Sequence, residues 1–372
     1  MKNPDFFYVV LGRVLSSGLQ ATFYFIFALM LTPEEYGNLS FLIAIAGVAA
    51  TISRFGLNQT IVVFQAKNSS FANQLNFLAL ISTSIAAIIL LSVDIFAAFL
   101  TLASSIFLMN IQNMLGLKKY KKYGLLNLIK GLLMIIFPII GFQFLEIEGI
   151  LLGMSLGYIV TSIHFFKYLS FKNNLRSQIR YNSKTIIHNF GVDISINLVR
   201  FVDKLVIVPI VGFAVLGIYQ LNLQILIGLE ILPTALHSYL LSEESSGKKH
   251  KKITFLAILF SILLVIATIF FSPYLIPQLF PNYIEGINSL MVLVFSIMPL
   301  TLSSILNAKL QAIESTKIGF SAIVRIGSLV ILIIILGSAY GLMGLSYSVL
   351  ISSSLYAIFL AFIFKIESRK KT

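Results

Sequence analysis

Residues 253–274 read ITFLAILFSILLVIATIFFSPY, a run of 22 residues without one charged side chain. An α-helix needs about 20 apolar residues to cross the ~30 Å hydrocarbon core of a bilayer, so this stretch is expected to span a membrane. The whole chain agrees, because 58% of its 372 residues are hydrophobic and 11% are charged. Soluble domains carry roughly 45–50% apolar and about 25% charged residues. A water-soluble fold has no interior for this much apolar surface, whereas lipid accepts it on the outside.

Similar apolar runs on both sides of this stretch predict an all-α, polytopic membrane protein with about twelve transmembrane helices. The expected spans are 6–31, 38–62, 72–92, 94–116, 124–144, 148–170, 190–211, 214–241, 253–274, 285–309, 318–338 and 342–364. The first span contains Arg13 and Gln20, but it is long enough to cross. We therefore interpret it as a retained helix rather than a cleaved signal peptide.

Lysine and arginine lie mostly in the connections on one side of the predicted membrane. Basic side chains cluster at Lys118–Lys122, Lys172–Lys184, Lys248–Lys252 and Lys365–Lys371. The opposite connections contain no Lys or Arg; they are 32–36, the turn at Asp94, 145–149, 212–213, 272–285 and 338–341. The positive-inside rule therefore predicts a multi-pass protein of the cytoplasmic (cell) membrane with both termini in the cytoplasm.

The residue inventory also limits the possible chemistry. The net charge of +13 comes mainly from the same basic connections. Their role in orienting the protein and in contacting the lipid bilayer explains this charge, so no nucleic-acid partner is expected. The absence of cysteine excludes disulfides and thiolate chemistry. No histidine has another His, Asp or Glu at metal-ligand spacing, and no glycine loop of the phosphate-binding type is present. We expect no catalytic residues, no metal and no cofactor.

The sequence falls into two halves around its longest polar connector. This division predicts an N-terminal six-helix lobe at 1–171, a cytoplasmic basic connector at 172–189 and a C-terminal six-helix lobe at 190–372. The halves resemble each other when Gly37 is aligned with Gly217, an offset of 180 residues. Each glycine lies in the outer turn between the first and second helix of its half. Two parallel repeats of this kind are typical of transporters with a substrate site between pseudo-symmetric lobes.

Ionisable side chains inside the spans are the candidates for substrate binding. Each costs roughly 2.5–3.5 kcal/mol at a helix centre, so it usually faces a cavity or a partner. The predicted site residues are Arg13, Arg54, Asp193, Arg200, Asp203, Lys204 and Arg325, and Glu230 also lies within a span. Cations outnumber acids in this set, and surplus positive charge in a shared interior chamber favours an anionic substrate.

The expected helix 190–211 is the richest in charge. Asp193, Arg200 and Lys204 are spaced i, i+7 and i+11, which predicts one continuous stripe. Asp203 is three residues after Arg200 and is expected to neutralise it in part. In the repeat alignment Arg13 corresponds to Asp193.

A structural interpretation of the same charges stays open. In this interpretation the charged side chains form ion pairs that hold helices together, for example Asp193 with Arg13. A second structural alternative concerns the arginines alone. The side chains of Arg13, Arg54 and Arg325 would extend from a helix end to the membrane surface.

Several motifs resemble one known family. The turn Leu31-Thr32-Pro33-Glu34-Glu35-Tyr36-Gly37 resembles the "LgpeeyG" turn of polysaccharide-biosynthesis flippases. These are the O-antigen flippase type within the multidrug/oligosaccharidyl-lipid/polysaccharide exporter superfamily. The stretch 116–123 is similar to that family's cytoplasmic loop after the fourth helix, 201–207 to its "aDrliig" pattern and 215–219 to its "avGiY" pattern. The resemblance covers essentially the whole chain in topology.

This resemblance implies a flippase that translocates lipid-linked oligosaccharide, a polyprenyl-pyrophosphate glycan, by alternating access. The headgroup would enter a basic cavity between two lobes while the polyprenyl tail stays in lipid, and polysaccharide-assembly membrane proteins would be partners. Only Asp203 and Lys204 match the family pattern residue by residue, at its Asp-Arg pair. Arg54 departs from it, because many relatives carry a neutral or acidic residue there.

Two other classes remain as alternatives. A multidrug-type, cation-coupled exporter needs an acidic cavity, and the surplus charge in these spans is basic. A membrane-embedded glycosyltransferase or acyltransferase needs a catalytic carboxylate or histidine in a sizeable aqueous loop. The longest outer loop, 272–285, offers only Glu285.

Overall fold

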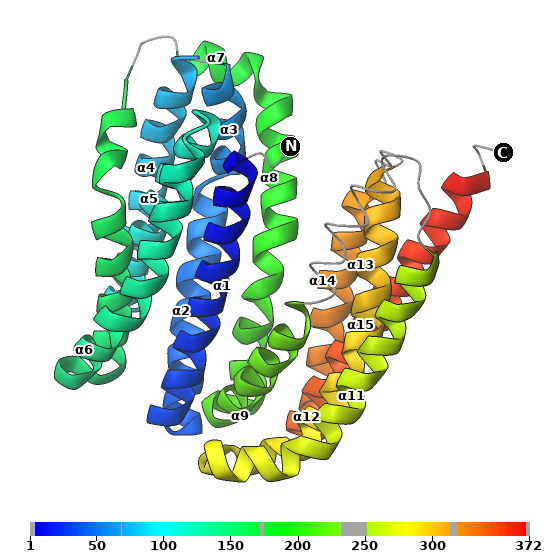
Figure 1. Cartoon of the computed structure of the whole chain (residues 1–372). Coiled ribbons are helices and arrows are strands. Elements are labelled where there is room, and N and C mark those ends of the chain that lie inside the picture. The colour runs from blue at the N-terminus through cyan, green and yellow to red at the C-terminus, as the bar shows by residue number, and fades with distance from the viewer. Residues whose placement is uncertain (1–3, 68, 172–174, 232–250, 313–317, 370–372) are drawn as a thin grey trace. The chain divides into compact units, whose positions relative to one another are not determined.

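The computed structural model describes residues 4–67, 69–171, 175–231, 251–312 and 318–369, and within them the chain is helical without a strand (Figure 1). The first-half elements are α1 Pro4–Met30, α2 Pro33–Ser53, α3 Leu57–Ala66, α4 Phe71–Leu90, α5 Ile95–Gly116, α6 Tyr120–Thr161, η1 Ile163–Tyr168, α7 Leu175–Tyr181, α8 Ser183–Asn197 and η2 Leu198–Arg200. The remaining elements are α9 Val202–Leu229, α11 Lys251–Leu279, η3 Pro281–Gly286, α12 Ile287–Leu293, η4 Val294–Ser296, α13 Ile297–Ala312, α14 Ile318–Leu332, η5 Ile333–Gly337 and α15 Ser338–Arg369. His237, His250 and the second part of the expected span 214–241 lie outside the described residues.

Eight helical segments of the described chain are long and apolar enough to cross a bilayer. Three of them contain a residue that reverses the backbone: Glu146 in α6, Gly212 in α9 and Gly341 in α15 have φ values of 49°, 82° and 54°. The 42 residues of α6 would extend about 63 Å as one helix, twice the thickness of the hydrocarbon core. Each reversal therefore separates two crossings. With the shorter apolar helix Val14–Met30, the described residues provide twelve crossings, as predicted.

The three reversals lie where the sequence predicts outer turns. The predicted turns 145–149, 212–213 and 338–341 contain Glu146, Gly212 and Gly341. Glycine adopts a positive φ at little cost, which explains two of the three turns.

Two predicted helices are interrupted. The expected span 38–62 breaks between α2 and α3, where Phe55 and Gly56 have φ values of 48° and 69°. The expected span 190–211 breaks at η2 and at Phe201, whose φ is −124°. The prediction of one continuous helical stripe through this segment is therefore wrong.

The chain separates into two compact units. The first unit comprises Met1–Ile26 and Phe41–Val202, and the second comprises Phe27–Ser40 and Asp203–Thr372. The turn between α1 and α2 thus packs with the second unit. The segments 1–171, 172–189 and 190–372 describe repeats in the sequence and stay a prediction.

Glycines bring helix backbones together in the first unit. Gly12 on α1 contacts Gly124 on α6, and Gly131 of α6 contacts Leu19 of α1. The two halves of α6 meet at Gly141 and Gly149. Helices α3, α4 and α5 form the core beside them, with the fully buried residues Leu57, Ile61, Leu75, Met109 and Phe165.

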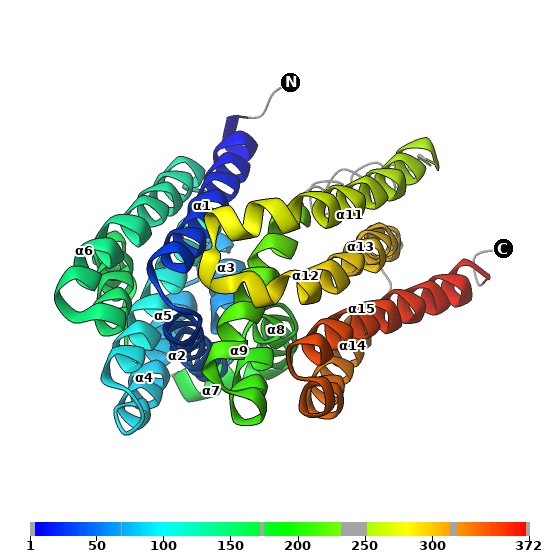
Figure 2. The same cartoon turned by 90° about the horizontal axis from the view of Figure 1, so that it is seen from below.

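The second unit is built around α11, α13, α14 and α15. In Figure 2, α13 lies between α11 and α15, in agreement with the packing of α13 against both helices. Leu306, Leu310 and Leu360 form part of its core. The Tyr283 hydroxyl of η3 donates to the Leu31 carbonyl at 3.1 Å, which holds the turn between α1 and α2 in this unit.

Candidate functional site

Arg54 lies at the break between α2 and α3, in the first unit. The left-handed backbone of Phe55 and Gly56 follows Arg54 directly and separates α2 from α3. A Cβ atom at Gly56 would collide with the backbone of Phe190 on α8, so glycine meets both the conformational and the steric demand. The break leaves Arg54 with only 4% of its surface exposed.

Two hydroxyl groups hold the Arg54 guanidinium, and its Nε is left without a hydrogen bond. Its Nη1 donates to the Ser105 Oγ on α5 at 3.0 Å, and its Nη2 reaches the Thr51 Oγ1 at 3.5 Å. The buried Nε has no hydrogen-bond partner. A guanidinium offers five N–H donors, so further contacts with an oxygen-rich group are possible here.

Asp193 on α8 faces the same region. It is fully buried, and its Oδ1 accepts hydrogen bonds from the Asn58 and Asn197 side-chain amides at 2.8 and 2.7 Å. Its Oδ2 has no partner. The carboxylate acts electrostatically on Arg54, but no ion pair within 4.0 Å joins the two groups in the described structure. The predicted alternative, an ion pair of Asp193 with Arg13, falls on a side chain that lies outside the described part of the chain.

Lys130, in the first half of α6, is a buried cation that the sequence reasoning missed. Its side chain is 8% exposed, and its Nζ lies 5.9 Å from the centre of the Phe107 ring. The Phe107 and Tyr158 rings lie 5.3 Å apart, and Tyr158 lies in the neighbourhood of Arg54. An aromatic pair therefore links Lys130 to the Arg54 region. A single lysine at the centre of the apolar run 124–144 was the signal that could have identified it.

The first unit buries more positive than negative charge. Its buried Asp, Glu, Lys and Arg residues, among those described, are Arg54, Lys130 and Asp193. Lys130 makes no ion pair within this part of the chain, and residues 95–145 contain no Asp or Glu. The interior of the first unit thus retains a cation without a matching acid.

Arg200 ends η2 and is exposed. It lies in the neighbourhood of Tyr24 on α1. Arg200 and Asp193 lie in the first unit, but the helix break between them removes the regular spacing that the sequence predicted.

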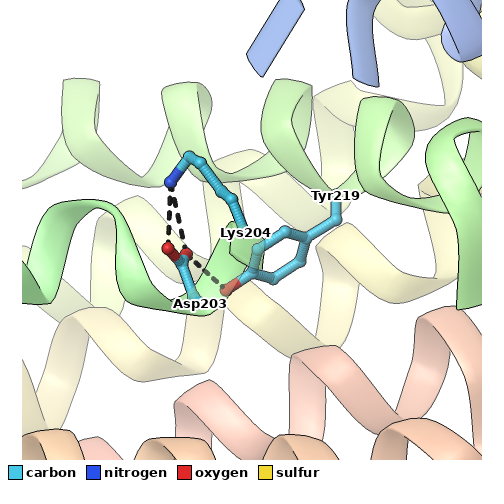
Figure 3. A network of polar contacts seen from close by, with 3 residues as sticks. All are labelled: Asp203, Lys204 and Tyr219. Atoms are coloured by element: carbon cyan, nitrogen blue, oxygen red, sulfur yellow. Dashed lines mark hydrogen bonds and ion pairs between the residues drawn. The ribbon is translucent and has the colours of Figure 1, made fainter. Parts of the chain in front are cut away.

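Asp203 and Lys204 open α9 in the second unit and form a buried cluster with Tyr219 (Figure 3). The Lys204 Nζ lies 3.1 Å from the Asp203 Oδ1 and 3.3 Å from its Oδ2. The Tyr219 hydroxyl donates to the Asp203 Oδ2 at 3.3 Å. Asp203 therefore neutralises Lys204, whereas the sequence predicted that it neutralises Arg200.

Arg325 is half-buried on α14 in the same unit. Its guanidinium lies 5.4 Å from the centre of the Tyr356 ring. The Asn307 amide donates to the Tyr356 hydroxyl at 2.8 Å, and the buried Asn307 Oδ1 has no partner. The positive charge of Arg325 is thus stabilised by an aromatic face.

The predicted residues fall into two groups. Arg54, Asp193 and Arg200 belong to the first unit, where Arg54 and Asp193 are brought together. Asp203, Lys204 and Arg325 belong to the second unit, where Asp203 and Lys204 form an ion pair. Among the described residues no group of three or more Asp, Glu or His side chains could hold a metal ion.

Comparison with known proteins supports the family resemblance. Residues 4–117 match the family model described as "Polysaccharide biosynthesis protein". An uncharacterized membrane protein of Methanocaldococcus jannaschii is 28% identical over 410 aligned positions, which cover 99% of this chain and 98% of that protein. The predicted recognition of the polysaccharide-biosynthesis family is thus confirmed for the N-terminal part of the chain.

Solved structures show the same fold. A multidrug resistance transporter of the MATE family, within the MOP superfamily, aligns with a TM-score of 0.68 and 14% identity over 98% of this chain and 99% of that one. The lipid II flippase MurJ aligns with a TM-score of 0.59 and 16% identity, over 97% and 81%. A MOP-superfamily transporter of Pyrococcus furiosus, described as having a binding pocket of reversed polarity, aligns with a TM-score of 0.58 and 15% identity, over 98% and 95%. The chain is therefore a membrane protein with the MATE and MurJ fold.

Proposed function

We propose that this protein is a flippase that translocates a lipid-linked oligosaccharide, a polyprenyl-pyrophosphate glycan, by alternating access. It would work in the cytoplasmic membrane with both termini in the cytoplasm, as the distribution of Lys and Arg favours. The family match over residues 4–117 and the fold shared with a lipid II flippase support this class of function.

The surplus buried cation of the first unit carries the proposal. An uncompensated charge in a membrane interior costs several kcal/mol. Lys130 has no acidic partner in the described structure, and the one buried acid of this unit, Asp193, faces Arg54. An anionic substrate group would supply the missing negative charge, and a pyrophosphate is such a group.

Arg54 and Lys130 would have different roles toward the pyrophosphate. Arg54 is fixed by Ser105 and Thr51, so its remaining N–H groups are oriented before the substrate arrives. A planar guanidinium matches phosphate oxygens in a bidentate manner, while a lysine ammonium acts as a point charge. Asp193 would balance Arg54 in the empty protein.

The chemistry of such a substrate also suggests partners. A lipid-linked glycan is assembled before translocation and consumed after it, so we propose polysaccharide-assembly membrane proteins and the lipid bilayer as partners. No nucleic-acid partner is part of this proposal.

The proposal is tested in vesicles that contain the purified protein and a fluorescent polyprenyl-pyrophosphate sugar. A membrane-impermeant quencher added outside reports how quickly labelled headgroups from the inner leaflet become accessible. The wild-type protein should accelerate this process over protein-free vesicles, and Arg54→Gln and Lys130→Gln should slow it at least tenfold. The control Arg176→Gln removes an exposed cation of α7 and should transport normally. Wild-type rates in both Arg54→Gln and Lys130→Gln would exclude the anion-binding role.

An exporter of small organic cations is the second candidate. The fold shared with a MATE transporter is compatible with it, and Asp193, with its unpartnered Oδ2, is a buried acid to which a cation could bind. The same vesicles decide between the two, because a cationic dye would then be moved and the labelled lipid would not. Loss of dye movement in Asp193→Asn would identify this second function.

A further inference from the structure

The short helix η1 presents an unusual combination of side chains directly after the last crossing of α6. Ile163 and Phe166 are 65% and 61% exposed, and between and after them come the exposed His164 and Lys167. Because η1 begins two residues after α6 ends, it lies at the level where the chain leaves the membrane. Exposed apolar side chains next to cations are typical of the bilayer interface.

Cations from two elements converge on His164. Lys122, on the first turn of α6, lowers the pKa of His164 below its ordinary value, with smaller contributions from desolvation and from Lys167. Lys121 is exposed beside Lys122 and extends the same positive patch. The packing agrees with this, because Tyr123 and Tyr168, the neighbours of Lys122 and Lys167, lie in one core cluster.

The protein fixes this patch in place. Lys122 precedes Tyr123 and Lys167 precedes Tyr168, and both tyrosines pack in one core cluster with Phe107 and Met114. Phe165, between His164 and Phe166, is fully buried in a second cluster. Both backbone segments are thus anchored, which keeps the three cationic side chains on one patch.

The described segments that carry this patch, α6 and η1, place no acid beside it. Between Asp94 and Asp193 the acids are Glu146 and Glu148, at the turn between the two halves of α6, the opposite end of those crossings. α6 and η1 therefore leave these cations to be neutralised by an external anion. The exposed Ile163 and Phe166 restrict its source, because a free anion in water would not cover them.

We propose that Lys122, His164 and Lys167, with Ile163 and Phe166, form a binding site for the phosphate headgroup of an anionic bilayer phospholipid. The apolar side chains insert between acyl chains, and the cations contact the phosphate. This site is separate from the interior cations Arg54 and Lys130, so it does not depend on the proposed transport function.

The first test needs no variant. The protein is placed in nanodiscs of phosphatidylcholine alone or with phosphatidylglycerol, and the ring signals of His164, assigned with a His164→Gln sample, are followed by NMR during a pH titration. A bound lipid phosphate compensates the two lysines, so the pKa of His164 should rise in phosphatidylglycerol more than that of His188, which is exposed on α8. Inorganic phosphate added to the phosphatidylcholine discs should leave it low. Equal shifts of both histidines would show only a general surface potential and would overturn the site, as would a full shift with inorganic phosphate.

The second test measures retention of phosphatidylglycerol by native mass spectrometry. Lys122→Gln and Lys167→Gln should each weaken binding about fivefold, the equivalent of about 1 kcal/mol for one cation near an anionic surface. The control pair Arg180→Gln and Lys184→Gln removes exposed cations of α7 and α8 and should bind lipid like the wild type. Equal retention in all variants would overturn the proposal.

Discussion

The backbones of Gly37 and Gly217 lie directly against each other, in a contact that leaves no room for a side chain on either residue. A Cβ on Gly37 would approach the Gly217 nitrogen to 2.9 Å, and one on Gly217 would approach the Gly37 nitrogen to 3.0 Å. The first would also collide with the Phe213 carbonyl and the second with the Pro33 carbonyl. Phe213 and Pro33 are 180 residues apart, like the two glycines, so the contact is reciprocal in the way that a two-fold axis produces.

This contact predicts that Gly37→Ala and Gly217→Ala each destabilise the protein. The obstructing atoms belong to the backbone, so neither side can yield without a shift of a whole turn. We expect a loss of about 1–3 kcal/mol, the usual cost of overpacking, visible as a lower melting temperature in detergent. The matched control is Gly228→Ala on α9, where nothing lies within 4 Å of the added carbon. A control that melts as early as the two contact variants would contradict the steric explanation.

Variants of Arg54 and Asp193 distinguish a structural role of this charge pair from a role in transport. Arg54→Gln leaves Asp193 buried without its nearby positive charge, and we expect a loss of about 1–3 kcal/mol. Asp193→Asn added to Arg54→Gln removes the stranded charge and should restore most of the stability. Transport of labelled lipid should stay at least tenfold reduced in the double variant, because the phosphate-binding cation is still missing. Recovery of both properties together would assign the pair a purely structural role.

The buried ion pair of Asp203 and Lys204 gives a different expectation. Lys204→Met removes the cation from the Asp203 carboxylate and leaves the Tyr219 hydroxyl bonded to it (Figure 3). Removal of one partner of a buried pair typically costs about 3–5 kcal/mol. Asp203→Asn combined with Lys204→Met should recover most of it, as measured by thermal unfolding in detergent. A double variant as unstable as Lys204→Met would show that the pairing of these two charges is not what matters.

The absence of native cysteine allows a direct test of orientation. Single cysteines at Lys121 and Arg180 should react with a membrane-impermeant maleimide only after the cytoplasmic side is opened. Cysteines at the exposed residues Val93 and Tyr340 should react in intact cells. The reverse pattern would invert the proposed topology, and mixed labelling at one residue would contradict an even number of crossings.

The crossings and their turns were predictable because they follow from apolar length and from where it is interrupted. The turns at Glu146, Gly212 and Gly341 coincide with the predicted outer turns. The repeat predicted from Gly37 and Gly217 corresponds to a physical contact, which a single sequence does not reveal.

The candidate site was less predictable, for two physical reasons. The stripe from Asp193 to Lys204 assumed an unbroken helix, and hydropathy does not detect the 3₁₀ turn at Leu198–Arg200 because it carries no information on the backbone hydrogen-bond pattern. The pairing of Asp203 with its neighbour Lys204 also conflicts with ideal helix geometry, in which adjacent side chains diverge. It forms where α9 begins and a long lysine can fold back.

Lys130 provides the sharpest test of the proposed function, because stability and activity should change in opposite directions. A buried cation without an acid is costly, so Lys130→Met should raise the stability by about 1–4 kcal/mol. The same change removes the surplus charge, and transport of labelled lipid should fall at least tenfold, since a hydrogen bond to a charged group contributes about 1.5–3 kcal/mol. Lys130→Arg keeps the charge and should retain transport within a few-fold, whereas Leu132→Met, on the exposed face of the same helix, should change neither property. A Lys130→Met protein that is more stable and transports normally would mean that the buried charge serves no substrate, and the anionic cargo would lose its main physical support.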